Sequence, residues 1–425
     1  MNNQRLELVA DFYEYTMANG YFNKNMQDRI AYFDVFFRKV PDEGGYAIVA
    51  GLEQIINYIR NLSFDEEDIN YLRKQNKFSE EFLNYLENFR FTGDIWAIPE
   101  GTVVFPNEPL ITVKAPIIQA QLLETMLLLT TNHQSLIATK TSRIVKEAQG
   151  RPVMEFGARR AHGINAAVEG ARAAIIGGAV GTSCTLSAKE FNVPASGTMA
   201  HSWIQSFESE YEAFKAYAEL YPDDCTFLID TYNTIESGLP NAIKVFNEVL
   251  KPKGYRPKAV RLDSGDLAYL SKKVRKILDE AGYEDCKICA TNSLDEYLIK
   301  SLIEQDAKID LFGVGENLIT AKSEPVFGGV YKLVALEKDK KIVPKIKVSE
   351  NTAKVTNPSF KKVYRFYDNE TKKAIADVIT LADEIIDERE YMIFDPQNPW
   401  KKKVLKDYSI RLLQEKIFEN RKINI

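Results

Sequence analysis

The stretch Lys258–Ser293, KAVRLDSGDLAYLSKKVRKILDEAGYEDCKICATNS, holds the pattern that decides the fold. Two short apolar runs, AVRL and KICA, flank a segment whose apolar residues recur at helical spacing. A strand, a helix and a second strand in this order predict a right-handed βαβ unit, and therefore parallel strands.

The same alternation extends on both sides of this stretch. Amphipathic segments such as LPNAIKVFNEVLK separate several of the apolar runs, which in chain order are PVMEFGAR, AAIIGGAVGTS, ASGTMAHS, CTFLIDTY, KAVRLDSGD, KICATNS and IDLFGVGEN. About six or seven βα units of this size favour a closed TIM-like α/β barrel. We assign this catalytic barrel domain to residues 131–330.

The two ends of the chain have a different texture. Residues 1–130 mix strand patterns such as IAYFDVFFRKV with helical ones, and a long helix is predicted from about Ile117 to Gln149. Residues 331–425 predict antiparallel, half-exposed strands, KKVYRFYD and AIADVIT, and a closing helix, YSIRLLQEKIFEN. We expect both ends to form one auxiliary α+β domain.

Composition excludes several classes of protein. The 425 residues are 45% hydrophobic, which excludes wholesale disorder, and a net charge of −5 gives no bulk attraction to nucleic acid. The N-terminus lacks the pattern of a signal peptide, and Gln119, Gln121 and Glu124 interrupt the most apolar helical stretch. Four cysteines do not form a disulfide framework, so we expect a cytoplasmic protein whose Cys286 and Cys289 are buried strand residues.

Polar or glycine-rich residues follow each apolar run. In a parallel barrel these positions converge on one mouth, where the active site lies. Arginine and backbone N–H groups bind phosphate, and aspartate oxygens suit Mg²⁺, so the set predicts a phosphorylated substrate carrying Mg²⁺. The residues are Arg159, Arg160, Thr182, Ser183, His201, Asp230, Arg261, Asp263, Asp266, Asn292, Ser293, Gly313 and Gly315.

Two positions at this mouth carry the densest chemistry. Strand alternation directs Arg261 and Asp263 to the same face, although a salt-bridged strand end with Ser264 or Asp266 as a helix cap would give the same pattern. His201 could accept a phosphoryl group or move a proton, or it could be structural, as we expect for His133 and His162.

Lysines, by contrast, precede the runs. Lys258 and Lys287 stand at the starts of their strands, where a Schiff-base lysine would not reach the barrel mouth. This placement disfavours an aldolase.

A set of motifs resembles the nicotinate phosphoribosyltransferase family. The motifs run in order from the N-terminus to about Lys332 and are FYEYTMANGYF, FFRKVP, GGYAIVAGLEQII, EFGARRAHG, GTMAHSW, VRLDSGDL and FGVGENLIT followed by PVFGGVYKL. The resemblance implies an irregular α/β barrel flanked by an auxiliary domain built from both chain ends. It also implies ATP-coupled, ligase-type synthesis of nicotinate mononucleotide from nicotinate and phosphoribosyl pyrophosphate, as a step of NAD salvage.

The resemblance also implies roles for individual residues. His201 would be phosphorylated transiently by ATP, with Asp230 and Asp263 as further catalytic residues that hold ribose hydroxyls or Mg²⁺. Tyr13, contributed across a homodimer interface, would stack on the pyridine ring opposite Phe156. The nicotinate carboxylate would meet Arg261 and Thr198. Phosphoribosyl pyrophosphate would be bound by Arg38, Arg159, Asn292, Gly313 and Gly315.

Two features bear on the substrate. Glu316 stands where many relatives have a threonine that touches the 5′-phosphate. The Thr182–Ser183 corner is neutral, whereas amide-using relatives have an acid near the ring, so a carboxylate substrate is favoured. A transferase for nicotinamide or quinolinate is the neighbouring alternative, and a sugar-phosphate barrel enzyme or an inactive binding protein are more distant ones.

Overall fold

The computed structural model describes residues 5–350, 355–387, 389–396, 398–419 and 422–423. Contacts divide the chain into two units, one made of residues 1–135 and 326–425 and the other of residues 136–325. The division falls within helix α6 (Glu124–Glu147). The first unit is therefore discontinuous in sequence.

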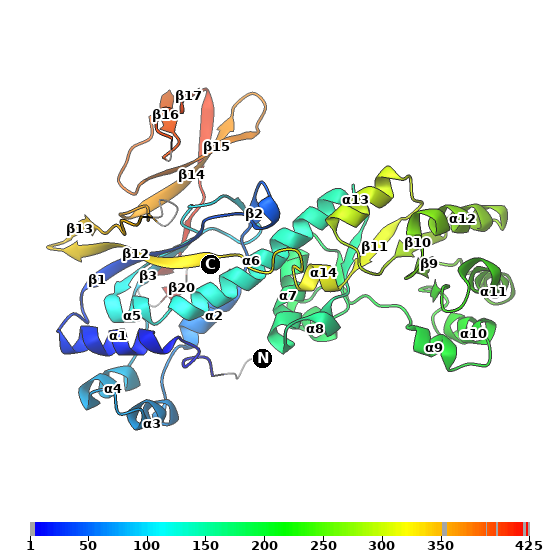
Figure 1. The fold of residues 1–425 in the computed structure, drawn as a ribbon, viewed down its shortest axis with the longest axis horizontal. Coiled ribbons are helices and arrows are strands. Elements are labelled where there is room, and N and C mark those ends of the chain that lie inside the picture. The colour runs from blue at the N-terminus through cyan, green and yellow to red at the C-terminus, as the bar shows by residue number, and fades with distance from the viewer. Residues whose placement is uncertain (1–4, 351–354, 388, 397, 420–421, 424–425) are drawn as a thin grey trace. The chain divides into compact units, whose positions relative to one another are not determined.

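Residues 136–325 form a parallel sheet with intervening helices (Figure 1). The strand order is β7-β6-β11-β10-β9-β8, and every pair is parallel. The strands are β6 (Val153–Glu155), β7 (Gly181–Thr182), β8 (Thr226–Leu228), β9 (Ala259–Leu262), β10 (Lys287–Ala290) and β11 (Leu311–Val314). The predicted mixed α/β fold with parallel strands is confirmed.

One or more helices separate each pair of successive strands in this unit. The helices of the unit are α7 (Ile164–Ile176), α8 (Thr185–Phe191), α9 (His201–Gln205), α10 (Glu210–Leu220), α11 (Leu239–Val245), α12 (Leu267–Glu280), α13 (Glu296–Glu304) and α14 (Glu316–Ile319). Asp266 caps α12 by accepting a hydrogen bond from the backbone N–H of Tyr269, as expected.

One predicted strand is wrong. In ASGTMAHS only Ala195 pairs, in a single bridge to Thr182, and His201 begins α9. The run is rich in small residues, and Met199 is its one buried residue, so it offers little apolar surface for packing as a strand. Between the described residues no ladder joins the edge strands β7 and β8, and closure of the barrel stays a prediction.

Aromatic rings and one glycine fix the edge of this sheet at β8. Phe227 of β8 stacks between Phe214 and Phe246, with ring centroids 4.6 and 5.5 Å apart. At Gly238, which leads into α11, an added Cβ would lie 1.8 Å from the carbonyl oxygen of Ile229. Only glycine allows the α11 segment to approach the end of β8 this closely.

The other unit is built on an antiparallel sheet of order β13-β12-β1-β5-β3-β19-β20. Its strands are β1 (Ile30–Phe37), β3 (Asp94–Ala97), β5 (Ile111–Pro116), β12 (Gly329–Lys338), β13 (Lys341–Pro344), β19 (Glu415–Glu419) and β20 (Lys422–Ile423). Smaller sheets contain β2 (Ala47–Ile48), β4 (Val103–Val104), β14 (Lys361–Asp368), β15 (Ala374–Leu381), β16 (Glu390–Phe394), β17 (Lys402–Lys406) and β18 (Tyr408–Leu412). The helices are α1 (Phe12–Asn23), α2 (Leu52–Asn61), α3 (Glu66–Lys74), α4 (Glu80–Glu87) and α5 (Ile117–Gln121).

Two helix predictions need correction. The helix expected from about Ile117 to Gln149 is interrupted, because α5 ends at Gln121 and α6 begins at Glu124. The C-terminal helix is wrong, since β18 and β19 occupy its place, and Asn420 lies outside the described residues. The strands form because β18 pairs with β14 and β19 pairs with β3, and these ladder bonds override a helical apolar pattern.

The remaining expectations from composition are also met in part. Cys286 and Cys289 are both buried free thiols, and Cys289 lies in β10 as predicted, whereas Cys286 directly precedes that strand. In the described part of the chain every helix is too short or too polar to cross a membrane.

Candidate functional site

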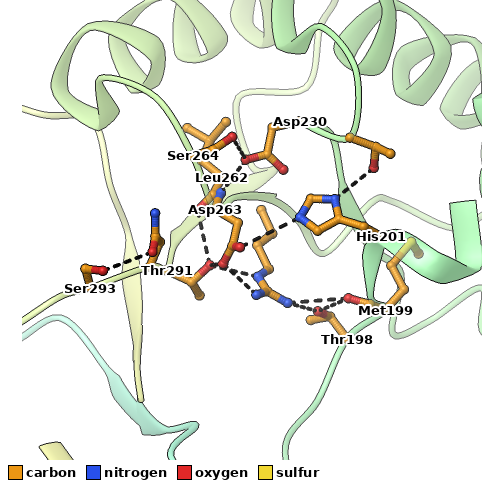
Figure 2. A network of polar contacts seen from close by, with 12 residues as sticks. Thr198, Met199, His201, Asp230, Leu262, Asp263, Ser264, Thr291 and Ser293 are labelled. Atoms are coloured by element: carbon orange, nitrogen blue, oxygen red, sulfur yellow. Dashed lines mark hydrogen bonds and ion pairs between the residues drawn. The ribbon is translucent and has the colours of Figure 1, made fainter. Parts of the chain in front are cut away.

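The centre of the site is Arg261 on β9. Figure 2 labels the residues that bind it, which are Thr198, Met199, Asp263 and Thr291. The Nε of Arg261 donates to Thr291 Oγ1 at 2.9 Å, and Nη2 donates to Asp263 Oδ1 at 2.8 Å. Nη1 donates to Thr198 Oγ1 at 3.1 Å and to the Met199 carbonyl at 3.4 Å. Four of its five N–H groups are thus engaged among the described residues, and one is left for a ligand.

Asp263 follows the same strand and points to the same side, as alternation predicted. Thr291 donates a second, short hydrogen bond to its Oδ1. Burial alone would raise the pKa of Asp263, but the Thr291 hydroxyl and the Arg261 guanidinium outweigh it and lower the pKa below its ordinary value. Asp263 is therefore a fixed negative charge.

His201 stands beside this pair at the start of α9. Its Nδ1 lies 3.1 Å from Thr231 Oγ1, and its Nε2 lies 3.7 Å from Asp263 Oδ2. The imidazole is 41% exposed, so a ligand can reach it. Thr231 orients the ring through Nδ1, so that Nε2 faces the carboxylate of Asp263.

Asp230 follows β8 and completes the network in Figure 2. Its Oδ2 accepts from the Asp263 backbone N–H at 2.7 Å and from Ser264 Oγ at 2.8 Å. Its Oδ1 is buried and has no hydrogen-bond partner within the described residues. A buried carboxylate oxygen without a protein partner suits a ligand hydroxyl or a cation.

The residues of this network could bind Mg²⁺ if protein carboxylates supplied only part of the ion's ligand shell. Within the described residues no group of three or more His, Cys, Asp or Glu side chains could hold a metal ion. Mg²⁺ commonly takes one or two carboxylates and completes its shell with water and substrate phosphates. Asp230, with its orphaned oxygen, meets that requirement together with Asp263.

A second cluster of predicted residues surrounds Phe156. The backbone N–H of Phe156 donates to the Val314 carbonyl at 2.8 Å. A Cβ on Gly313 would lie 2.6 Å from the Phe156 ring and 2.8 Å from Thr291 Cγ2, so this glycine makes room for both side chains. At Gly315 a Cβ would lie 3.0 Å from the Phe156 carbonyl oxygen. Gly313 therefore adjoins both Phe156 and Thr291, and Thr291 belongs to the Arg261 network.

The loops after β10 and β11 contain the other predicted phosphate residues. Asn292 and Ser293 both have positive φ, 80° and 52°, an uncommon backbone for two successive residues with side chains. Asn317 Nδ2 donates to the Ser293 carbonyl at 2.9 Å and stabilises this turn.

Glu316 does not present an unpaired negative charge. It pairs with Lys322 at 2.9 Å and with Arg160 at 3.7 Å. The hydrogen bond and charge of Lys322 lower the pKa of Glu316. Lys322 and Arg160 therefore offset the negative charge of Glu316, which would otherwise repel a bound phosphate.

The remaining predicted residues lie outside this network. Arg159 is exposed in a short turn three residues after Phe156. Tyr13 and Arg38 belong to the other unit. Tyr13 lies on α1 and is 44% exposed. Arg38 follows β1, with its guanidinium 5.5 Å from the Phe36 ring centroid and a buried Nε that has no partner in the described chain.

Comparisons with known proteins agree along the whole chain. The model described as "Nicotinate phosphoribosyltransferase (NAPRTase) family" matches residues 152–380, and the N-terminal and C-terminal domain models match residues 8–132 and 360–424. The chain is 46% identical to nicotinate phosphoribosyltransferase of Bacillus subtilis over 415 residues, covering 97% of this chain and 84% of that protein. The chain belongs to the nicotinate phosphoribosyltransferase family.

More distant relatives are consistent with this membership. Nicotinate phosphoribosyltransferase of Homo sapiens is 30% identical over 436 residues, covering 89% of this chain and 80% of that protein. The crystal structure of human nicotinic acid phosphoribosyltransferase superposes with a TM-score of 0.86 at 26% identity, covering 97% of this chain and 90% of that one. The nicotinate phosphoribosyltransferase family thus accounts for both the motifs and the fold.

The sequence interpretation missed several residues of the site in this family member. Thr291 bridges Arg261 and Asp263, and Thr231 orients His201. Ser264, expected as an alternative helix cap, instead donates to Asp230. Each directly adjoins a residue that was selected or lies within a selected motif, so adjacency was the available signal. Glu155 adjoins Phe156 in the same way.

Proposed function

We propose that the chain transfers the phosphoribosyl group of phosphoribosyl pyrophosphate to nicotinate, giving nicotinate mononucleotide and pyrophosphate. The observation that carries this proposal is Arg261, a guanidinium held by four hydrogen bonds with one N–H group remaining. Such a preorganised cation suits a small carboxylate ligand. Membership in the nicotinate phosphoribosyltransferase family supports the same substrate.

The proposed chemistry is a displacement at the anomeric carbon of ribose. The pyridine nitrogen forms the new bond to carbon as the bond to pyrophosphate breaks, through a transition state with oxocarbenium character. This step needs little acid–base help, but it needs positioning and exclusion of water. Arg261 and Thr198 would hold the nicotinate carboxylate, and Phe156 would stack on one face of the ring.

The phosphoribosyl pyrophosphate side of the site would be formed by cations, backbone N–H groups and carboxylates. Arg38, Arg159, Asn292, Gly313 and Gly315 would bind its phosphates. Asp230 and Asp263 would bind ribose hydroxyls or hold Mg²⁺, which neutralises charge on the leaving pyrophosphate when bound.

ATP would act through His201. We propose that the imidazole attacks the γ-phosphorus, so that a P–N bond forms, the P–O bond breaks and ADP leaves; water later releases phosphate. Thr231 at Nδ1 leaves Nε2 as the nucleophile. The added charge would reorganise hydrogen bonds beside the site and drive synthesis of the nucleotide.

We extend the proposal to the assembly. The enzyme would be a cytoplasmic homodimer with an irregular TIM-like barrel, and Tyr13 of the second protomer would cover the other face of the ring. The half-exposed ring of Tyr13 on α1 is available for such a contact.

The deciding experiment measures nicotinate mononucleotide formation with and without ATP. We expect ATP to stimulate the wild type, and His201→Ala to lose the stimulation while retaining slow ATP-independent synthesis. His162→Ala, at an exposed histidine outside the network, is the matched control. Undiminished stimulation in His201→Ala would remove His201 from this role, and turnover of nicotinamide or quinolinate in place of nicotinate would overturn the substrate.

A further inference from the structure

Glu155 is a completely buried carboxylate at the end of β6, directly before Phe156. Its Oε2 accepts a hydrogen bond from Thr182 Oγ1 at 2.6 Å, and its Oε1 accepts a short one from the Gly157 backbone N–H. Its own carbonyl oxygen accepts from the Ser183 backbone N–H at 2.9 Å. One residue therefore contacts the loop after β6 and the loop after β7.

The direction of the Thr182 hydrogen bond is fixed by a third partner. Thr182 Oγ1 accepts from the Cys184 backbone N–H at 2.9 Å, so its single proton is free to point at Glu155. Thr182 is itself completely buried. The resulting series of hydrogen bonds runs from Cys184 through Thr182 to Glu155 and Gly157. These bonds hold the backbone of both loops.

A buried carboxylate is a costly way to fill space. Burial raises the pKa of Glu155, and the hydrogen bonds from Thr182 and Gly157 oppose that rise; no cation of the described residues contributes to the shift. An apolar side chain would meet a packing requirement at lower free-energy cost. Compared with an apolar side chain, the carboxylate of Glu155 adds the two hydrogen bonds to Thr182 and Gly157.

The two loops held by Glu155 carry residues of the proposed site for the pyridine ring. The loop after β6 carries Phe156, whose ring packs at the position where Gly313 lacks a side chain. The loop after β7 carries Ser183, which is exposed, whereas Thr182 behind it is not. The Thr182–Ser183 corner carries no charge of its own, but the buried carboxylate of Glu155 lies directly behind it.

We infer that Glu155 is a positioning residue that sets the spacing between Phe156 and Ser183, and thereby the fit of the pyridine ring and its carboxyl substituent. This inference rests on the proposed function, because it takes Phe156 as the ring contact. It names Thr182 as the link through which Glu155 acts. Neither Glu155 nor Thr182 needs to touch the substrate.

The test separates the hydrogen bond from the volume of the side chain. Thr182→Val keeps the shape and removes the hydroxyl, whereas Thr182→Ser keeps the hydroxyl. We expect Thr182→Val to raise the KM for nicotinate about tenfold, with kcat and the KM for phosphoribosyl pyrophosphate changed by less than about twofold, and Thr182→Ser to restore it. Thr141→Val, which removes a buried hydroxyl bonded to the Ile137 carbonyl of α6, is the matched control for stability.

A second variant tests Glu155 itself. Glu155→Gln offers one acceptor oxygen in place of two, so it should raise the same KM, and the double variant with Thr182→Val should add little to either single change. If Glu155→Gln does not fold, the Thr182 pair decides. A wild-type nicotinate KM in folded Thr182→Val, or an equal rise in both substrate KM values, would overturn the inference. Failure of the wild type to make nicotinate mononucleotide would instead overturn the proposed function.

Discussion

At the scale of single residues, the guanidinium of Arg261 is held by neighbours of different kinds. Two are neutral threonine hydroxyls, one is a carbonyl and one is the carboxylate of Asp263. The fork geometry of arginine is what allows these contacts on several sides at once. Lysine has the same charge but cannot reproduce that arrangement.

Arg261→Lys should therefore raise the KM for nicotinate by about 10- to 100-fold, because a charge-assisted contact and its support are lost together. The KM for phosphoribosyl pyrophosphate should change much less. Steady-state kinetics with each substrate varied in turn measures the split. Arg256→Lys, at an exposed arginine paired with Asp285, is the control, and equal changes in both KM values would instead assign Arg261 to phosphate binding.

Asp263 gives a pH-dependent contribution to stability. Its pKa is lower in the folded chain than the unfolded value of about 3.9, so its contribution is complete above that value and is lost as pH falls through the folded pKa. The difference in unfolding free energy between the wild type and Asp263→Asn should be larger at about pH 6 than at about pH 3. Urea unfolding at both values, with the exposed Asp339→Asn as control, checks this, and a difference independent of pH would contradict it.

Much of the residue-level site could be predicted. Asp230, Arg261 and Asp263 lie at the ends of apolar runs that form parallel strands, which bring such ends together. His201 was selected in the same way although its run forms no strand, and Thr198 was expected only from the family resemblance. For Glu155 and Thr291 adjacency to the selected residues Phe156 and Asn292 was the only signal, because a buried polar side chain within an apolar run has no pattern of its own. The bonds of Thr291 to Arg261 and Asp263 exist only once neighbouring strands are in register.

At the scale of elements, the end of β8 depends on Gly238. The segment leading into α11 passes so close that a Cβ would meet the Ile229 carbonyl, and Asp230 is the next residue. Backbone cannot move aside as a flexible side chain can.

Gly238→Ala should therefore destabilise the chain by about 1–3 kcal/mol and displace Asp230, which lowers kcat as well as the melting temperature. Calorimetry and steady-state kinetics measure the two effects. Gly45→Ala, where an added Cβ meets nothing within 4 Å, is the matched control. An unchanged kcat in folded Gly238→Ala would show that the position of Asp230 tolerates this shift.

The elements also mark where sequence patterns stop being informative. The βαβ units were predictable because each joins strands that are close in sequence. The strands β18 and β19 were not, since their partners β14 and β3 lie far away along the chain and Gln414 between them bonds the Pro109 carbonyl and the Val363 N–H. The apolar pattern within a short segment carries no information about pairing partners that lie so far away in the sequence.

At the scale of the whole molecule, shared active sites make a distinct prediction. If Tyr13 acts across a dimer, a variant inactivated at Tyr13 and one inactivated at His201 should complement each other, because one hybrid site receives both native residues. Equal mixing after dissociation should recover about a quarter of wild-type activity. Activity of the mixture against each variant alone is the measurement, and no recovery in verified hybrid dimers would speak against shared sites.

The discontinuous unit has a consequence for the order of synthesis. Strands β1 and β3 are made early, but β12 and β19, which cover their free edges, lie at residues 329–338 and 415–419. The nascent chain must therefore carry two open β-edges while all of residues 136–325 emerge from the ribosome. Unit 136–325 has its full set of strands first, and the unit that begins the chain is the last to be completed.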